Sequence, residues 1–168
     1  MPQGGGIVIT YAAHLVGDGN ISAGDDVSDA RWFTPATLPT DLAGVYLRNT
    51  ENPLLPAISL YHPFDGDGML HSVSFADGEA RYANRFVRTQ AFLDEREAGE
   101  SLWAGMAEDP ASSLREDGWG ARPRLKDASS TDVVVHRGEA LSSFWMCGDL
   151  YRHDPRTLEA LGRTEWDG

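Results

Sequence analysis

The amino-acid sequence predicts an all-β protein, and three observations lead to this class. Most short runs alternate apolar and polar residues, which is the period of a strand and not of a helix. Eighteen glycines and nine prolines divide the chain into segments of strand length. Pairs of these runs are joined by residues typical of tight turns. Successive hairpins form meanders, and meanders packed radially form a β-propeller with blades of roughly 40–50 residues.

Three hairpins are expected in order along the chain: 71–75 with 79–88, 131–136 with 139–146, and 150–154 with 158–162. Asp77 and Gly78 occupy the first turn, because this pair favours the tight turn of a two-residue hairpin. An Arg-Gly pair takes the same place in the second hairpin. Asp154 and Pro155 begin the third turn.

The helical signal is weak and is confined to one segment. Residues 94–106 begin with acidic side chains, which favours a short helix, although Gly99 and Gly105 weaken the pattern. The polar connection 108–130 is rich in Gly, Pro and Ser. We expect it to leave the sheets as a long loop, and loops of this length often carry functional residues.

Composition limits the class of protein and its partners. A chain of 168 residues with 41% apolar residues is long enough for one ordinary domain with a core. Its net charge of −12 comes from 26 acidic and 14 basic residues, and Lys126 is the single lysine. Nucleic-acid binding needs concentrated positive charge, so we expect no nucleic-acid partner.

The same composition indicates a compartment. No apolar run approaches the roughly 20 residues that cross a bilayer. The start of the chain, MPQGGG, lacks the basic and apolar regions of a secretory signal. With Cys147 alone, an intramolecular disulfide is impossible. We therefore expect a cytoplasmic protein without a transmembrane segment.

The segment YHPFDGDGML, residues 61–70, and the histidine that follows it suggest either a metal site or a tight turn. An EF-hand calcium loop that starts at Asp65 would need glycine at its sixth position, where Leu70 stands. That pattern fails. A histidine site, with His62 and His71 brought together across a hairpin, is harder to exclude.

The architectural interpretation is favoured by the pattern of the strand 69–75. His71 would share a face with Met69, Val73 and Phe75, and a histidine on an apolar face is more often a hydrogen-bonded core residue than a ligand.

The other polar residues of the segment fit a turn. We expect Asp65 and Asp67 to accept backbone hydrogen bonds there. Gly66 and Gly68 are expected to adopt the positive φ angles that a turn demands.

Four longer motifs carry a family resemblance: LPTDLAGVYLRNTENP (38–53), YHPFDGDGMLHSVSFADGEARYANRFVRT (61–89), KDASSTDVVVHRGEAL (126–141) and CGDLYRHDPRTLEALG (147–162). In this order and spacing they resemble the N-terminal part of the carotenoid cleavage oxygenases, over residues 40–168. The resemblance implies a partial β-propeller, the first blades of a seven-bladed ring. It also implies ferrous iron held by four histidines, and cleavage of a conjugated carbon–carbon double bond by dioxygen.

The sequence departs from this family in its histidines. In the family the first iron histidine follows the segment that resembles 158–168, and the others come later. None of the five histidines here matches a ligand position: His14, His62, His71, His136 and His153. We therefore expect this chain to be an N-terminal fragment that holds neither Fe²⁺ nor activity by itself.

The resemblance also indicates substrate contacts. Phe64 is expected to face the substrate cavity. Stilbene-cleaving relatives grip a phenol with a tyrosine and a lysine, and this sequence has Met106 and, approximately, Trp145 there. An apolar polyene or apocarotenoid is therefore the expected substrate. Many relatives have a glutamate, hydrogen-bonded to an iron-bound histidine, where Met146 stands; methionine accepts no strong hydrogen bond.

The beginning of the chain resembles a different family. Residues 7–39 resemble the C-terminal end of a Nudix hydrolase, which divides the chain into a Nudix-tail-like β segment, 1–39, and the oxygenase-like portion, 40–168. Asp25, Asp26 and Asp29 could bind cations, although three acids around a turn are more often a solvated loop.

Two alternative functions remain open at this stage. The chain could be a small non-catalytic β domain that serves as an interaction module, since 168 residues can bury a core. Residual Nudix-type hydrolysis is the third hypothesis. It needs magnesium-binding glutamates at helical spacing, and the sequence shows none.

Overall fold

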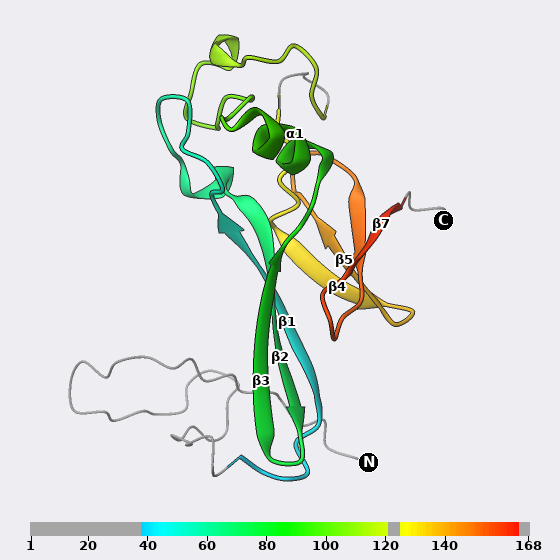
Figure 1. Cartoon of the computed structure of the whole chain (residues 1–168). Coiled ribbons are helices and arrows are strands. Elements are labelled where there is room, and N and C mark those ends of the chain that lie inside the picture. Colours follow the sequence, from blue (N-terminus) through cyan, green and yellow to red (C-terminus); the bar gives the residue numbers. More distant parts are fainter. Residues whose placement is uncertain (1–37, 121–124, 165–168) are drawn as a thin grey trace, which may run out of the picture.

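A computed structural model of the chain describes residues 38–120 and 125–164. The predicted Nudix-like segment, with Asp25, Asp26 and Asp29, lies outside the described residues apart from its last two positions. The all-β prediction is confirmed, because the described chain forms two antiparallel sheets and one α-helix (Figure 1).

The first sheet contains three strands in the order β1-β2-β3: β1 (Gly44–Asn52), β2 (Asp67–Ala76) and β3 (Glu79–Phe86). The first predicted hairpin is confirmed as β2 and β3. Asp77 and Gly78 connect them with φ angles of 53° and 76°. Two successive positive φ angles match the right-handed twist of the flanking strands, which is why Asp-Gly is favoured there.

The second sheet has four strands in the order β4-β5-β6-β7: β4 (Asp132–His136), β5 (Glu139–Ser143), β6 (Leu150–His153) and β7 (Ala160–Thr164). Both remaining hairpins are confirmed. β5 ends at Ser143, earlier than the predicted 146, because the chain leaves the sheet toward the loop 144–149. Asp154 starts the last turn by accepting from the backbone N–H groups of Arg156 and Thr157.

The helix α1 (Gln90–Ala98) begins four residues before the predicted helix and ends well before its predicted end. The Thr89 side chain caps it by accepting from the Phe92 N–H at 3.0 Å. Gly99 ends it in the left-handed conformation, with φ at 77°. In the described part of the chain no helix is long and apolar enough to cross a membrane.

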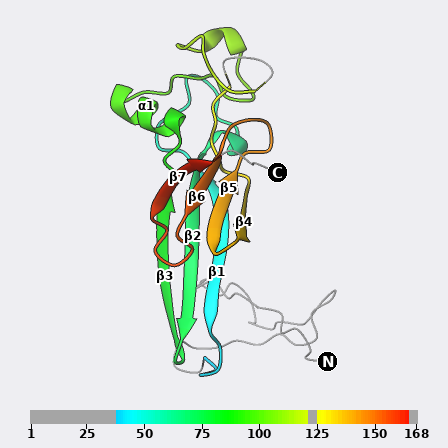
Figure 2. The ribbon, with the colours of Figure 1, turned by 90° about the vertical axis from the view of Figure 1, so that its right-hand side faces the viewer.

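The core lies where the two sheets and α1 meet. Leu70, Val87, Tyr151 and Leu158 form its buried cluster, with partly buried side chains of both sheets packed against it. The Asn49 side chain joins the sheets, because it donates to the Ser129 and Asp132 carbonyls at 2.8 and 3.1 Å. Figure 2 shows that the first sheet extends well beyond the second.

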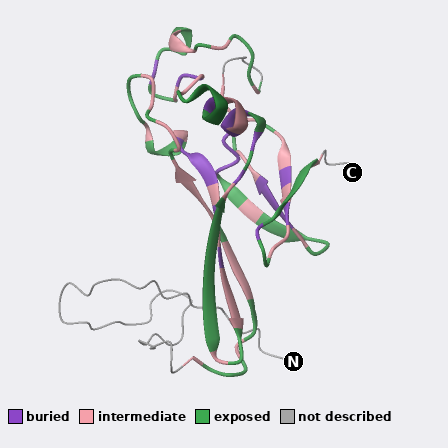
Figure 3. Ribbon diagram, viewed as in Figure 1, coloured by how far each residue is buried: buried purple, intermediate pink, exposed green. Residues whose placement is uncertain are grey.

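The buried face of β2 differs from the prediction. Leu70 and Ser72 are buried, whereas His71 is only half-buried, like Met69. The expectation that His71 points into the core is therefore wrong. The physical reason is that the Leu70 side of β2 packs in the cluster with Tyr151 of β6 and Leu158 of the turn between β6 and β7. Almost all of β3 is exposed (Figure 3).

Candidate functional site

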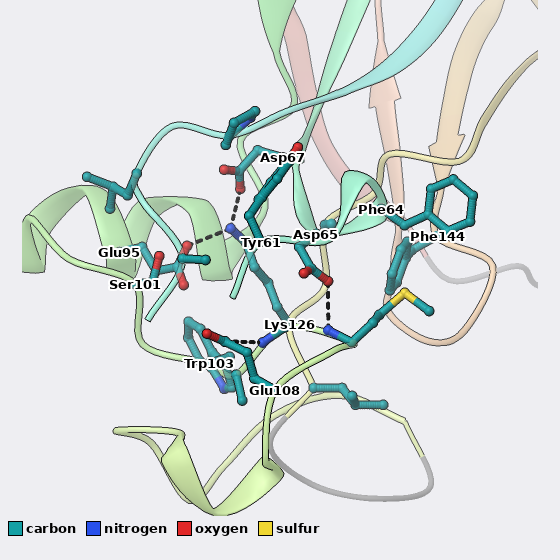
Figure 4. Close-up of a pocket in the computed structure, with 18 of the residues that line it drawn as sticks. Tyr61, Phe64, Asp65, Asp67, Glu95, Ser101, Trp103, Glu108, Lys126 and Phe144 are labelled. Carbon is teal, nitrogen blue, oxygen red and sulfur yellow. Dashed lines mark hydrogen bonds and ion pairs between the residues drawn. The ribbon is translucent and has the colours of Figure 1, made fainter. Parts of the chain in front are cut away.

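The candidate site is a cavity of about 50 Å³, lined by residues of α1, of the segment before β2 and of the long loops (Figure 4). Aromatic and sulfur-containing side chains form much of its wall: Tyr61, Phe64, Trp103, Met106, Phe144 and Met146. Five charged groups line it as well: Asp65, Asp67, Glu95, Glu108 and Lys126. Whole small-molecule sites measure about 300–1,000 Å³, so this cavity has room for one end of a ligand.

The segment before β2 forms the wall that carries Phe64. His62 caps the short 3₁₀ helix η2 (Pro63–Asp65), and its side chain accepts from the Phe64 N–H. The Asp65 carboxylate accepts from the His62 N–H at 2.9 Å and from the Met106 N–H at 2.8 Å. It therefore holds Met106 beside the helix that presents Phe64.

The glycines of this segment serve a different purpose from the predicted one. Gly66 has a φ of −69°, and Gly68 is not among the residues with positive φ, so that expectation is wrong. Both positions require glycine because other backbone segments pass very close. A Cβ on Gly66 would lie 2.6 Å from the Asn52 nitrogen, and one on Gly68 would lie 2.3 Å from the Ser129 oxygen.

A buried ion triad forms the deepest polar part of the wall. The Lys126 ammonium lies 2.7 Å from Asp67 Oδ1 and 2.6 Å from Glu95 Oε2. Burial alone lowers the pKa of Lys126, but the two carboxylates outweigh it and raise that pKa. The triad joins β2, α1 and the loop before β4 around one cation.

Glu108 fixes the opposite wall. Its carboxylate accepts from the Ser59 N–H and hydroxyl, and from the N–H groups of Leu60 and Gly105. Burial raises the pKa of this carboxyl, yet these hydrogen bonds outweigh it and lower the pKa to about 2. The carboxylate thus ties the segment before η2 to the turn that carries Met106.

Two of the three residues expected at the substrate cavity, Phe64 and Met106, line this cavity. Met146, expected only at the position of the family's glutamate, lines it as well. Trp145 is not among the residues that line it. Its side chain is 58% exposed, and Phe144 takes the place on the wall. Figure 4 shows Phe64 and Phe144 close to one another on the same side of the cavity.

The sequence did not predict the ion pairs that the charged residues of the wall form. Asp67 was expected only to accept backbone hydrogen bonds; it does accept from the Leu54 N–H at 3.2 Å, but it also pairs with Lys126. The partners Glu95 and Lys126 are far from it in sequence. No local pattern in the sequence indicates that Asp67, Glu95 and Lys126 meet.

The described histidines do not form an iron site. His62 caps η2, and His71 lies between Thr50 Oγ1 at 2.8 Å and the Tyr82 hydroxyl at 2.5 Å. His153 is buried beside Ser142 Oγ, and burial lowers its pKa to about 4. Within 38–120 and 125–164 there is no group of three His, Cys, Asp or Glu residues that could hold a metal. These residues do not fit the iron that the resemblance implies, and no chemical step can be assigned to iron on them.

Asp127 is a further buried carboxyl, and it does not line the cavity. Asp127 accepts from the Ser129 and Asp149 N–H groups at 3.1 and 3.0 Å, and from the Tyr151 hydroxyl at 3.2 Å. No cation pairs with it among the described residues, and burial raises its pKa to about 6 despite these hydrogen bonds. Asp127 thus links the loop before β4 to β6.

Comparisons with known proteins agree on one family. A family model described as retinal pigment epithelial membrane protein matches residues 33–168. Apocarotenoid-15,15'-oxygenase of Synechocystis sp. is 33% identical over 137 residues, which are 79% of this chain and 27% of that protein. Isoeugenol monooxygenase of Pseudomonas nitroreducens is 33% identical over 131 residues, which are 78% of this chain and 26% of that protein.

A solved structure supports the same relationship. Lignostilbene dioxygenase of Pseudomonas brassicacearum superposes with a TM-score of 0.61 at 25% identity, over 76% of this chain and 25% of that chain. The chain spans about a quarter of the length of the curated relatives that it matches.

Proposed function

The chain belongs to the carotenoid cleavage oxygenases, and from that membership we propose that the protein acts in the oxidative cleavage of a conjugated carbon–carbon double bond in an apocarotenoid. The two antiparallel sheets are then part of a β-propeller. The observation that supports the proposal is the cavity wall, where Phe64 and Met106, both expected at the substrate cavity, meet Met146.

The wall suits one end of an apolar polyene. Phe64, Phe144 and Trp103 offer flat apolar surfaces, while the two methionines adapt to irregular shapes. The residues of this chain bind that end, orient it and exclude water from it. Asp65 and Glu108 support this role by fixing the loops that carry the apolar side chains.

A hydroxystilbene fits this wall less well than an apocarotenoid. Tyr61 and Lys126 do line the cavity, and a phenol could in principle use such groups. However, the Lys126 ammonium is already held by Asp67 and Glu95, so it has little capacity for a ligand. Met106 adds an apolar thioether, which is a weak acceptor and no donor.

Iron, if the protein uses it, would be held by residues other than those of 38–120 and 125–164. In the family, ferrous iron supplies the activation of dioxygen. We propose that this chain contributes substrate contacts and architecture to that chemistry. The remaining assignments of the proposal are a cytoplasmic location and the division into a Nudix-tail-like segment, 1–39, and an oxygenase portion, 40–168.

The substrate class can be tested by titrating an apocarotenal, and separately a hydroxystilbene, into the protein. Binding is measured by the quenching of tryptophan fluorescence. Trp103 lines the cavity and supplies the signal, which Trp103→Phe should diminish. We expect the apocarotenal to bind about tenfold more tightly or better, which corresponds to about 1.4 kcal/mol.

The matched variants are Phe64→Ala in the cavity and Leu161→Ala on β7, whose side chains are 50% and 43% exposed. Phe64→Ala should weaken the apocarotenal, whereas Leu161→Ala should leave it unchanged. Equal or tighter binding of the hydroxystilbene, or equal effects of the two variants, would contradict the proposal.

A further inference from the structure

A second hollow, separate from the cavity, lies on another side of α1. It is a groove of about 540 Å³ between the end of β3, α1 and the turn that joins β6 to β7. Figure 2 shows β7 beside the upper part of β3, with α1 beyond their ends. The two hollows share no residue, although α1 contributes to both: Glu95 to the cavity and Arg96 to the groove.

Three arginines from neighbouring elements line this groove: Arg85 on β3, Arg88 after β3, and Arg96 on α1. The Arg85 Nε donates to the Thr157 carbonyl at 3.2 Å, and the Arg96 guanidinium lies 5.7 Å from the centre of the Phe92 ring. Glu159 is the single carboxylate on the described wall. The groove therefore carries an excess of positive charge on a protein whose net charge is −12.

These arginines differ from others in the molecule. Arg81, Arg115, Arg152 and Arg163 each form an ion pair with a carboxylate. Within the described residues, Arg85, Arg88 and Arg96 form none. Guanidinium groups that line one groove without an ion-pair partner can recognise a bidentate anion.

The floor of the groove is apolar. Met69 and Phe86 are partly exposed there, and the Phe86 ring lies 5.2 Å from the ring of Phe92. Phe92 and Leu158 support them from the core, with exposures of 4% and 1%. An inorganic anion would use the arginines but leave this floor unused. A ligand with a carboxylate at one end and a hydrocarbon chain satisfies both, because contact of the chain with the apolar side chains is also favourable.

We propose that this groove binds a long-chain carboxylate, with its carboxylate against Arg85, Arg88 and Arg96 and its chain along the partly exposed Met69 and Phe86. Its volume falls in the range of small-molecule sites, about 300–1,000 Å³. The carboxylate exchanges hydration water for charge-assisted hydrogen bonds from the guanidinium groups.

The test is isothermal titration of three probes below their aggregation concentrations: dodecanoate, dodecanol and acetate. Dodecanoate should bind at one site, at least about tenfold more tightly than either other probe. Comparable binding of dodecanol would show that the arginines play no part, and comparable binding of acetate would show that the floor plays none. Either result overturns the proposal.

Matched triple variants separate a specific site from general electrostatics. Arg85→Gln, Arg88→Gln and Arg96→Gln together should weaken dodecanoate at least about tenfold. The control variant, Arg81→Gln with Arg137→Gln and Arg156→Gln, removes the same charge at exposed positions outside the groove. An equal loss in the control would overturn the proposal. Thermal melts of both variants verify that each remains folded.

The methyl group of Met69 gives a local readout, because Met69 lines the groove while Met106 and Met146 line the cavity. Dodecanoate should shift the Met69 methyl resonance and leave the other two in place. Shifts at Met106 and Met146 without one at Met69 would place the ligand in the cavity and overturn the proposal.

Discussion

Lys126 shows how a single side chain can determine whether this fold tolerates its own buried charge. Two carboxylates, Asp67 and Glu95, are buried, with relative exposures of 2% each. Their charge is compensated locally by one ammonium that is itself largely enclosed. A buried pair is weak evidence for net stabilisation, but removal of one partner leaves an uncompensated charge, which is costly.

Lys126→Met should therefore lower the free energy of unfolding by about 3–5 kcal/mol in urea denaturation. Arg81→Met serves as the control, because its ion pair with Glu79 is exposed and should contribute about 0–1 kcal/mol. A loss below about 1 kcal/mol for Lys126→Met would show that the triad is not the buried unit described above.

Asp127 should titrate near neutrality, because burial raises its pKa to about 6 from 3.8. A carboxyl whose pKa is higher in the folded than in the unfolded protein stabilises the folded state when it is protonated. The contribution of this group to stability is therefore largest at low pH and declines as the pH rises from about 3.8 to 6.

Carbon-13 NMR of the aspartate carboxyl groups measures this directly. The Asp127 resonance should have its midpoint near 6. Asp154 is the internal control, because hydrogen bonds from the Thr157 and Arg156 N–H groups lower its pKa below 3.8. A midpoint for Asp127 at or below that of Asp154 would be incompatible with its burial.

At the scale of the elements, Glu108 holds the loops around the cavity together through the hydrogen bonds that its carboxylate accepts. In Glu108→Gln the side chain keeps one acceptor oxygen in place of the two carboxylate oxygens that bind the N–H groups of Leu60 and Gly105. At least one of these hydrogen bonds is lost, so amide hydrogen exchange of Leu60 and Gly105 should become faster. Glu97→Gln on the exposed side of α1 should not change these rates. Unchanged protection in Glu108→Gln would refute the role of this carboxylate.

The same carboxylate predicts a pH dependence. Its pKa is lowered from 4.5 to about 2, so its stabilisation of the loops is fully present above about 4.5 and is lost as the pH falls toward 2.

The strands were easier to predict than the helix for a physical reason. Alternation and two-residue turns are local signals, and Asp77–Gly78 alone determines where β2 ends and β3 begins. The helix depends on its caps: Thr89 and Gly99 delimit α1, whereas the acidic residues that suggested its start lie inside it. The buried face of β2 could not be read from its own residues, because it is set by contacts with the second sheet.

Over the whole molecule, the family resemblance predicted apolar side chains of the site but not its charged side chains. Phe64 belongs to one of the quoted motifs, Met106 and Met146 were singled out by comparison with relatives, and the structure brings all three to one cavity. The triad of Lys126, Asp67 and Glu95 joins three elements that only tertiary packing places together. Sequence patterns carry no information about such a contact without a known relative.

The central claim is that the cavity lined by Phe64, Met106 and Met146 receives an apocarotenoid. Methyl-selective NMR of the methionines during titration with an apocarotenal tests it most directly, because Met106 and Met146 line the cavity and Met69 does not. We predict saturable shifts of the Met106 and Met146 methyl resonances with an unchanged Met69 resonance. Shifts confined to Met69, or none that saturate, would contradict the claim.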